Sequence, residues 1–92
     1  MNIIWSISAE INYLDILEQV YEKWNLKIMQ PLESQVNDLL NKISIHNHIC
    51  PVSKITDLHK CVVNEHISMI YKMKNNFIEI VALIFNQSNH QF

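Results

Sequence analysis

The sequence has no glycine in its 92 residues, and this absence restricts the fold more than any other feature. The preferred two-residue turns of β-hairpins need positive φ angles, which glycine adopts without steric cost. Helices need no glycine in their interiors and commonly use one only at the C-terminal end. We therefore predict an all-α fold.

The apolar content is high for a chain of this length. Apolar residues make up 49% of the sequence, which excludes a disordered segment. A chain of this size forms one domain with a modest core, so part of its apolar surface stays uncovered. We predict a single helical domain over residues 1–92 that dimerises, or covers a protein partner, with a wide apolar face.

Apolar residues recur at helical spacing in three segments, and we predict helices at residues 6–29, 31–45 and 54–87. The first has an apolar stripe at close to the coiled-coil period, opposite a solvated face that carries Asp15 and Glu18. The stripe consists of Ile7, Ile11, Leu14, Leu17, Tyr21, Trp24 and Ile28. The last segment has two adjacent stripes, which one antiparallel helix cannot cover.

Two positions leave the helix boundaries open. Pro31 is tolerated at the first position of a helix, so it marks the start of the second helix, although one long helix kinked at Pro31 is the alternative. Asn75 and Asn76 are weak helix formers and divide the last helix in a second alternative. The fold is then a long antiparallel helical hairpin, completed by dimerisation into a four-helix bundle, or a small three- or four-helix bundle.

The charged residues disfavour several classes of partner. All seven basic residues are lysine and the formal net charge is −2, so we expect no nucleic-acid binding. The chain lacks the basic start of a signal peptide and the run of about 20 apolar residues that spans a membrane. We expect a cytoplasmic protein, and the abundance of Ile, Asn and Lys is typical of a phage or a low-GC bacterium.

Six of the seven histidines and cysteines lie between His46 and His66. His46, His48 and Cys50 alternate, so an extended loop would point them the same way, and His59 would complete a tetrahedral zinc site. The spacing lacks the paired ligands of strong zinc motifs, so we expect no cofactor and keep zinc as the alternative. In a reducing cytoplasm we expect free thiols, with a Cys50–Cys61 disulfide as the less favoured alternative.

The same cluster offers little for catalysis. Cys50 and His59 are the only candidate nucleophile and base, and the sequence indicates neither an oxyanion hole nor a third orienting group. We predict that the chain is not an enzyme.

The function that the sequence favours is a small helical module that binds proteins as a regulator, an inhibitor or an immunity-type protein. Its wide apolar face would bind a protein partner, a second copy, or both. A zinc- or redox-responsive helical sensor that uses residues 46–66 is the alternative. Large aromatic side chains dominate interface energetics, and six of them are the predicted partner anchors. They are Trp5, Tyr21, Trp24, Tyr71, Phe77 and Phe85.

Overall fold

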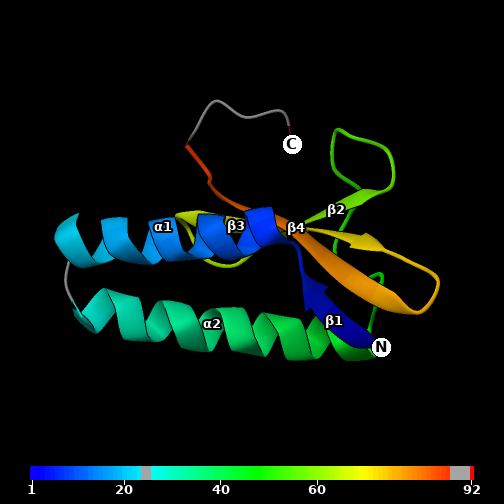
Figure 1. Ribbon diagram of the computed structural model, residues 1–92, viewed down its shortest axis with the longest axis horizontal. Coiled ribbons are helices and arrows are strands. Elements are labelled where there is room, and N and C mark those ends of the chain that lie inside the picture. Colours follow the sequence, from blue (N-terminus) through cyan, green and yellow to red (C-terminus); the bar gives the residue numbers. More distant parts are fainter. Residues whose placement is uncertain (24–25, 88–91) are drawn as a thin grey trace.

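The computed structural model describes residues 1–23, 26–87 and 92, and the side chains of these residues except at positions 21 and 26–30. It contains two helices and a four-stranded sheet (Figure 1). In chain order the elements are β1 (Asn2–Trp5), α1 (Ile7–Lys23), α2 (Leu26–Ile45), β2 (Leu58–Val62), β3 (Ile67–Met73) and β4 (Phe77–Phe85). The fold is therefore mixed α/β, and the all-α prediction is wrong, whether as a helical hairpin or as a bundle.

The error lies in the C-terminal third, where the predicted helix at residues 54–87 is replaced by three strands. Asparagine provides turns that need no glycine. Between β2 and β3, Asn64 Oδ1 accepts hydrogen bonds from the backbone N–H groups of His66 and Ile67, at 2.7 and 2.9 Å. Side-chain acceptors of this kind close a turn without a positive φ. Asn75 and Asn76 lie in the turn between β3 and β4, so the position predicted as a helix break is a hairpin turn.

The strands form one sheet in the order β1-β4-β3-β2. The short N-terminal β1 pairs parallel with β4, whereas β3 pairs antiparallel with both β2 and β4. The β3–β4 register shifts between Ile70 and Tyr71, which leaves Val81 without a partner on β3. Such a bulge bends a strand locally and resets which side chains face the core.

Helices α1 and α2 form an antiparallel pair that packs on the sheet (Figure 1). The first two predicted helices thus exist, but the first ends at Lys23 and the second begins at Leu26, so Pro31 lies inside α2 and does not mark its start. The start of α1 is fixed to the sheet by Ser6. Its N–H donates to the Ile80 carbonyl at 3.0 Å, and its Oγ accepts from the Ala9 N–H at 3.0 Å as an N-cap.

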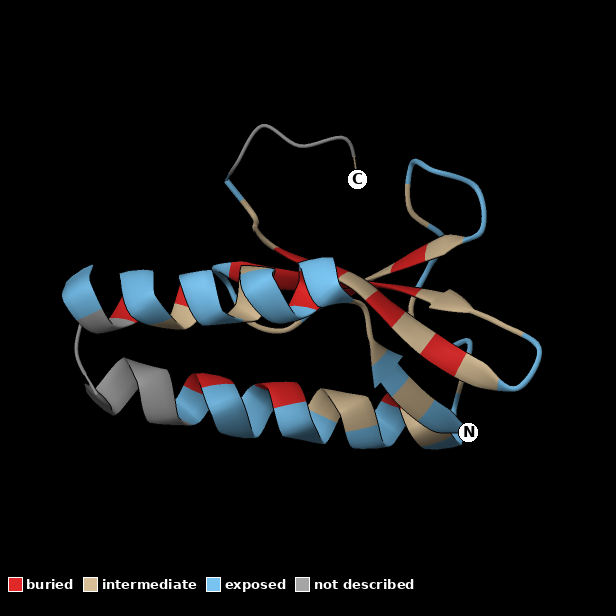
Figure 2. Cartoon of the chain, viewed as in Figure 1, coloured by how far each residue is buried: buried red, intermediate tan, exposed pale blue. Residues whose placement is uncertain are grey.

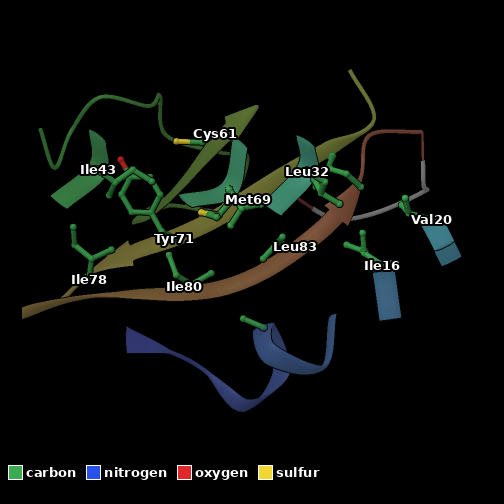
Figure 3. Packing of buried hydrophobic residues seen from close by; sticks show 13 residues of the cluster. Ile16, Val20, Leu32, Ile43, Cys61, Met69, Tyr71, Ile78, Ile80 and Leu83 are labelled. Atoms are coloured by element: carbon green, nitrogen blue, oxygen red, sulfur yellow. The ribbon is translucent and has the colours of Figure 1, made fainter. Parts of the chain in front are cut away.

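The core lies between the helix pair and the sheet, where side chains from α2, β3 and β4 converge (Figure 3). Burying each large aliphatic side chain there contributes about 1.5–3 kcal/mol. The helices supply Ala9, Ile16, Val20, Leu32, Val36 and Ile43, and the sheet supplies Cys61, Ile67, Met69, Tyr71, Ile78, Ile80 and Leu83. Neither of the described helices is both long and apolar enough to cross a membrane.

The orientation of α1 differs from the sequence prediction. Ile7, Ile11 and Leu14, which begin the predicted apolar stripe, are 78%, 52% and 65% exposed. At about 100° per residue, they lie opposite Ala9 and Ile16, which face the core. The cause is the tie between Ser6 and the sheet, which sets the rotation of the helix where it begins. Tyr21, Trp24 and Ile28, which continue the predicted stripe, lie outside the described side chains.

Candidate partner-binding surface

The loop that follows α2 is held against the edge of the sheet by a disulfide between Cys50 and Cys61. Their Cα atoms are 5.3 Å apart, inside the range of about 4.4–6.8 Å that disulfides need. Residues 46–57, here called the stapled loop, also contact β2 through the backbone: the Lys60 N–H donates to the Pro51 carbonyl at 3.0 Å. The expected free thiols are therefore wrong, and the less favoured disulfide is what the structure contains.

His59 on β2 is bound by its neighbours and is only 8% exposed. Its Nδ1 lies 2.8 Å from the Cys50 carbonyl oxygen. A carbonyl only accepts, so Nδ1 carries the proton in this hydrogen bond. The ring stacks on Tyr71, with centroids 4.9 Å apart and planes 13° apart, and the His48 ring meets it edge-on at 5.9 Å. These contacts give His59 a structural role in fixing the stapled loop.

Tyr71 on β3 completes the attachment of the stapled loop. The side chain is fully buried, and its hydroxyl donates to the Asn47 carbonyl at 2.8 Å. Burial raises the pKa of the phenol above its ordinary value of about 10. Tyr71 was predicted to anchor a partner, but it lies in the core of the protein and presents no surface to one.

The four predicted zinc ligands do not come together as one site. The Cys50 sulfur is used in the disulfide, and the protonated nitrogen of His59 points at a carbonyl. His46 and His48 remain in the stapled loop. Within the described part of the chain, no three His, Cys, Asp or Glu side chains gather closely enough to hold a metal ion.

The other predicted partner anchors lie in different places. Trp5 is half-buried on β1 and stacks on Tyr13 of α1, with centroids 5.3 Å apart. Phe77 and Phe85 are half-buried at the two ends of β4. Tyr21 and Trp24 lie outside the described side chains. The aromatic residues thus form no continuous exposed face in the described part of the molecule.

The outward side of α1 is exposed (Figure 2), yet it carries three large aliphatic side chains. Ile7, Ile11 and Leu14, here called the α1 seam, are spaced i, i+4 and i+7, which aligns them in one row along the helix. Exposed carboxylates surround this row, and Lys23 is the only basic residue of α1. The acidic residues are Glu10, Asp15, Glu18 and Glu22.

A groove runs beside the α1 seam, between α1 and the C-terminal half of β4. Its volume is about 240 Å³ and it is open to solvent. The floor and the β4 side are apolar, while the α1 side presents the carboxylate of Asp15 and two amides. The groove is lined by Asn12, Asp15, Ile16, Gln19, Leu83, Ile84 and Phe85. Asp15 therefore belongs both to the acidic surround of the seam and to the groove.

Sequence reasoning missed the α1 seam as a surface, although its three residues were in the predicted stripe. The spacing of apolar residues shows that a helix has an apolar side, but not what that side packs against. Reading Ala9, Ile16 and Val20 as a second, smaller apolar side of the same helix would have shown that two sides compete for the core.

Comparison with known proteins identifies the fold. No protein-family model and no curated protein sequence matches the chain. Among solved structures, the chromosomal ParDE toxin–antitoxin system of Pseudomonas aeruginosa contains a chain with a TM-score of 0.69, over 92% of this chain and 95% of that one, at 13% identity. The YoeB/ParE toxin of Agrobacterium tumefaciens has a TM-score of 0.66, over 94% and 99% of the two chains, at 12% identity.

A third structure, the YoeB dimer of Staphylococcus aureus, has a TM-score of 0.60, over 89% of this chain and 92% of that one, at 17% identity. Identities this low show a shared fold. The chain therefore has the mixed α/β fold of the ParE and YoeB toxin structures, and it is not the helical interaction module that the sequence predicted.

Proposed function

We propose that the chain is an inhibitor-type regulatory protein of a toxin–antitoxin pair, and that it acts by binding other proteins. The observation that carries the proposal is the likeness to the ParDE chain, which extends over 92% of this chain and 95% of that one. The likeness therefore extends over almost the whole of the fold described above and not over a single motif. The small size of the chain, 92 residues, agrees with this proposal.

Binding is favoured over catalysis because the chemically reactive side chains of the stapled loop, β2 and β3 are bonded to other groups of the protein or buried. The sulfurs of Cys50 and Cys61 are joined, His59 is hydrogen-bonded to a carbonyl, and Tyr71 is buried. Nucleic-acid chemistry is disfavoured because the chain has no arginine and a formal net charge of −2. The α1 seam, in contrast, exposes three large aliphatic side chains in a row, as protein-binding surfaces do.

The test is controlled production of the chain inside bacteria from a tightly repressed promoter. An inhibitor-type protein stops growth after induction, whereas the core variant Tyr71→Ala should do so less, because loss of a buried aromatic side chain destabilises the fold. Growth that continues while the wild-type chain accumulates in folded form would contradict the proposed function.

The same culture tests the binding mechanism. Total RNA and chromosomal DNA from the arrested cells are compared with those of uninduced cells. We expect both to stay intact, because a protein that acts by binding breaks no phosphodiester bond. Arrest that coincides with cleaved nucleic acid would show that the chain is an inhibitor but that the non-enzymatic mechanism is wrong.

A further inference from the structure

We infer that the α1 seam and the adjoining groove form a docking site for an amphipathic helix of a protein partner, with lysine or arginine beside its apolar stripe. The inference deepens the proposed function, since it names the class of partner segment that the chain binds. It rests on three observations: the row of exposed aliphatic side chains, the carboxylates around that row, and the groove that contains Asp15.

The spacing of the seam fits a helix better than an extended strand. Ile7, Ile11 and Leu14 repeat at four and three residues, the pattern by which helices pair side by side. The helix partner of α1 inside the protein is α2, which packs on another side, so the seam has no cover among the described residues. An amphipathic helix offers matching apolar side chains at i, i+3, i+4 and i+7.

The charges around the seam decide between a foreign helix and a second copy of this chain. Glu10, Asp15, Glu18 and Glu22 are exposed on α1, against the single base Lys23. Two copies joined through their α1 seams would bring these carboxylates together, and like charges at an interface oppose association. A helix with lysine or arginine beside its apolar stripe gains from the same charges.

The groove supplies one directed contact. Its β4 side, formed by Leu83, Ile84 and Phe85, is apolar, and Asp15 stands on the opposite side. Lysine and arginine bury an aliphatic stem along apolar surface while the charged end reaches a carboxylate. One basic side chain of the docked helix would therefore lie in the groove and pair with Asp15.

The probe for this site is a pair of synthetic helical peptides with the same leucine stripe, one with lysine at the flanking positions and one with glutamate. Fluorescence anisotropy measures binding of each to the full chain. The lysine peptide should bind at least about tenfold more tightly than the glutamate peptide. Its affinity should fall as salt is raised from low to physiological ionic strength, because exposed charges are then screened.

Variants locate the site. The double substitution Ile11→Asp with Leu14→Asp should lower affinity for the lysine peptide about tenfold or more, and Asp15→Asn should lower it severalfold. Val62→Asp is the matched control, since Val62 is a 67% exposed aliphatic side chain on β2, away from α1, and its substitution should leave binding unchanged.

Three outcomes would overturn the inference: equal binding of both peptides, binding that survives the α1 variants, or a free chain whose dimer is lost in the Ile11→Asp, Leu14→Asp variant. The last result would make a second copy the occupant of the seam. The peptide assay needs only folded chain, so failure there leaves the growth assay untouched. Conversely, peptide binding at α1 without growth arrest would refute the proposed function and keep the docking site.

Discussion

The stapled loop and the α1 seam use their residues in opposite ways. The stapled loop and its neighbours on β2 and β3 contain the histidines, cysteines and buried tyrosine from which chemistry is usually expected, yet these groups bind one another. The seam contains only aliphatic side chains, which normally stabilise a core, yet they point outward. Residue type alone therefore misplaces the functional surface, because what each side chain contacts decides its role.

The two regions differ in whether their polar groups form hydrogen bonds within the protein or face solvent. In the stapled loop, the Asn47 and Cys50 carbonyls accept hydrogen bonds from Tyr71 and His59, so the loop is fixed in one arrangement. On α1, the carboxylates are exposed, where a partner's charges can reach them, and the aliphatic row gains from burial only when a partner covers it. The first region contributes to folding, and the second to association.

The largest expected effect is on the free energy of unfolding, from a change at Tyr71, the buried residue that holds the stapled loop. Tyr71→Ala should lower the free energy of unfolding by about 3–5 kcal/mol, because it removes a fully buried aromatic side chain and its hydrogen bond. Chemical denaturation measures the change. Leu14→Ala, a large-to-small change on the seam, should shift stability by no more than about 0.5 kcal/mol. Similar losses in the two variants would remove the distinction between the regions.

The disulfide should have the next largest effect. The bridge closes a sequence separation of 11 residues, and closing a loop of that size in the unfolded chain is worth about 2–3 kcal/mol. Reduction, or the double substitution Cys50→Ala with Cys61→Ala, should therefore lower the unfolding free energy by that amount. Binding of the lysine peptide to the reduced chain should not change. A loss of binding on reduction would mean that the stapled loop belongs to the binding surface.

A smaller effect concerns the hydroxyl of Tyr71. Tyr71→Phe leaves the Asn47 carbonyl without its donor and should cost about 1 kcal/mol at neutral pH. The pKa of Tyr71 is raised in the folded protein, so above about pH 10 the unfolded chain loses this proton first and stability falls as pH rises. In the variant, the free energy of unfolding should fall less steeply as pH rises above about 10. Parallel curves for the two proteins would refute a raised pKa at Tyr71.

The smallest effect on stability is expected from the carboxylates of α1. Glu18→Gln should change the unfolding free energy by no more than about 0.5 kcal/mol, because the side chain is exposed. The affinity of the Glu18→Gln variant for the lysine peptide, measured by anisotropy at low salt, should nevertheless decrease. The dependence of this affinity on salt should also become weaker. Asp57→Asn in the stapled loop also removes one exposed negative charge and is the control, and an equal decrease in affinity in both variants would indicate a general charge effect.

Sequence reasoning located the two helices because their periodicity extends over more than three turns in each. It failed for β2, β3 and β4, where apolar runs such as Phe77 to Phe85 are compatible with either a buried strand or a helix. Absence of glycine was given too much weight, since Asn64 closes a turn with its own side chain. Parallel pairing of β1 with β4 joins opposite ends of the chain, which no local pattern reports.

The candidate site was harder to predict for a related reason. The cluster from His46 to His66 was recognised, but its spacing could not distinguish a metal site from a disulfide, since both depend on which side chains of the loop and of β2 meet in space. The direction in which α1 presents Ile11 and Leu14 depends on how Ser6 joins the helix to the sheet. Such long-range contacts decide which of two apolar sides becomes the core.

Hydrogen–deuterium exchange, measured with and without saturating lysine peptide, tests the central claim most directly. The claim is that the partner helix binds on α1, while the stapled loop and β2 contribute to folding and not to binding. A docked helix should stabilise α1 against local opening, so amides between Ile7 and Lys23 should exchange more slowly in the complex. Amides of residues 46–62 should exchange as they do in the free protein. Protection of residues 46–62, with α1 unchanged, would contradict the account.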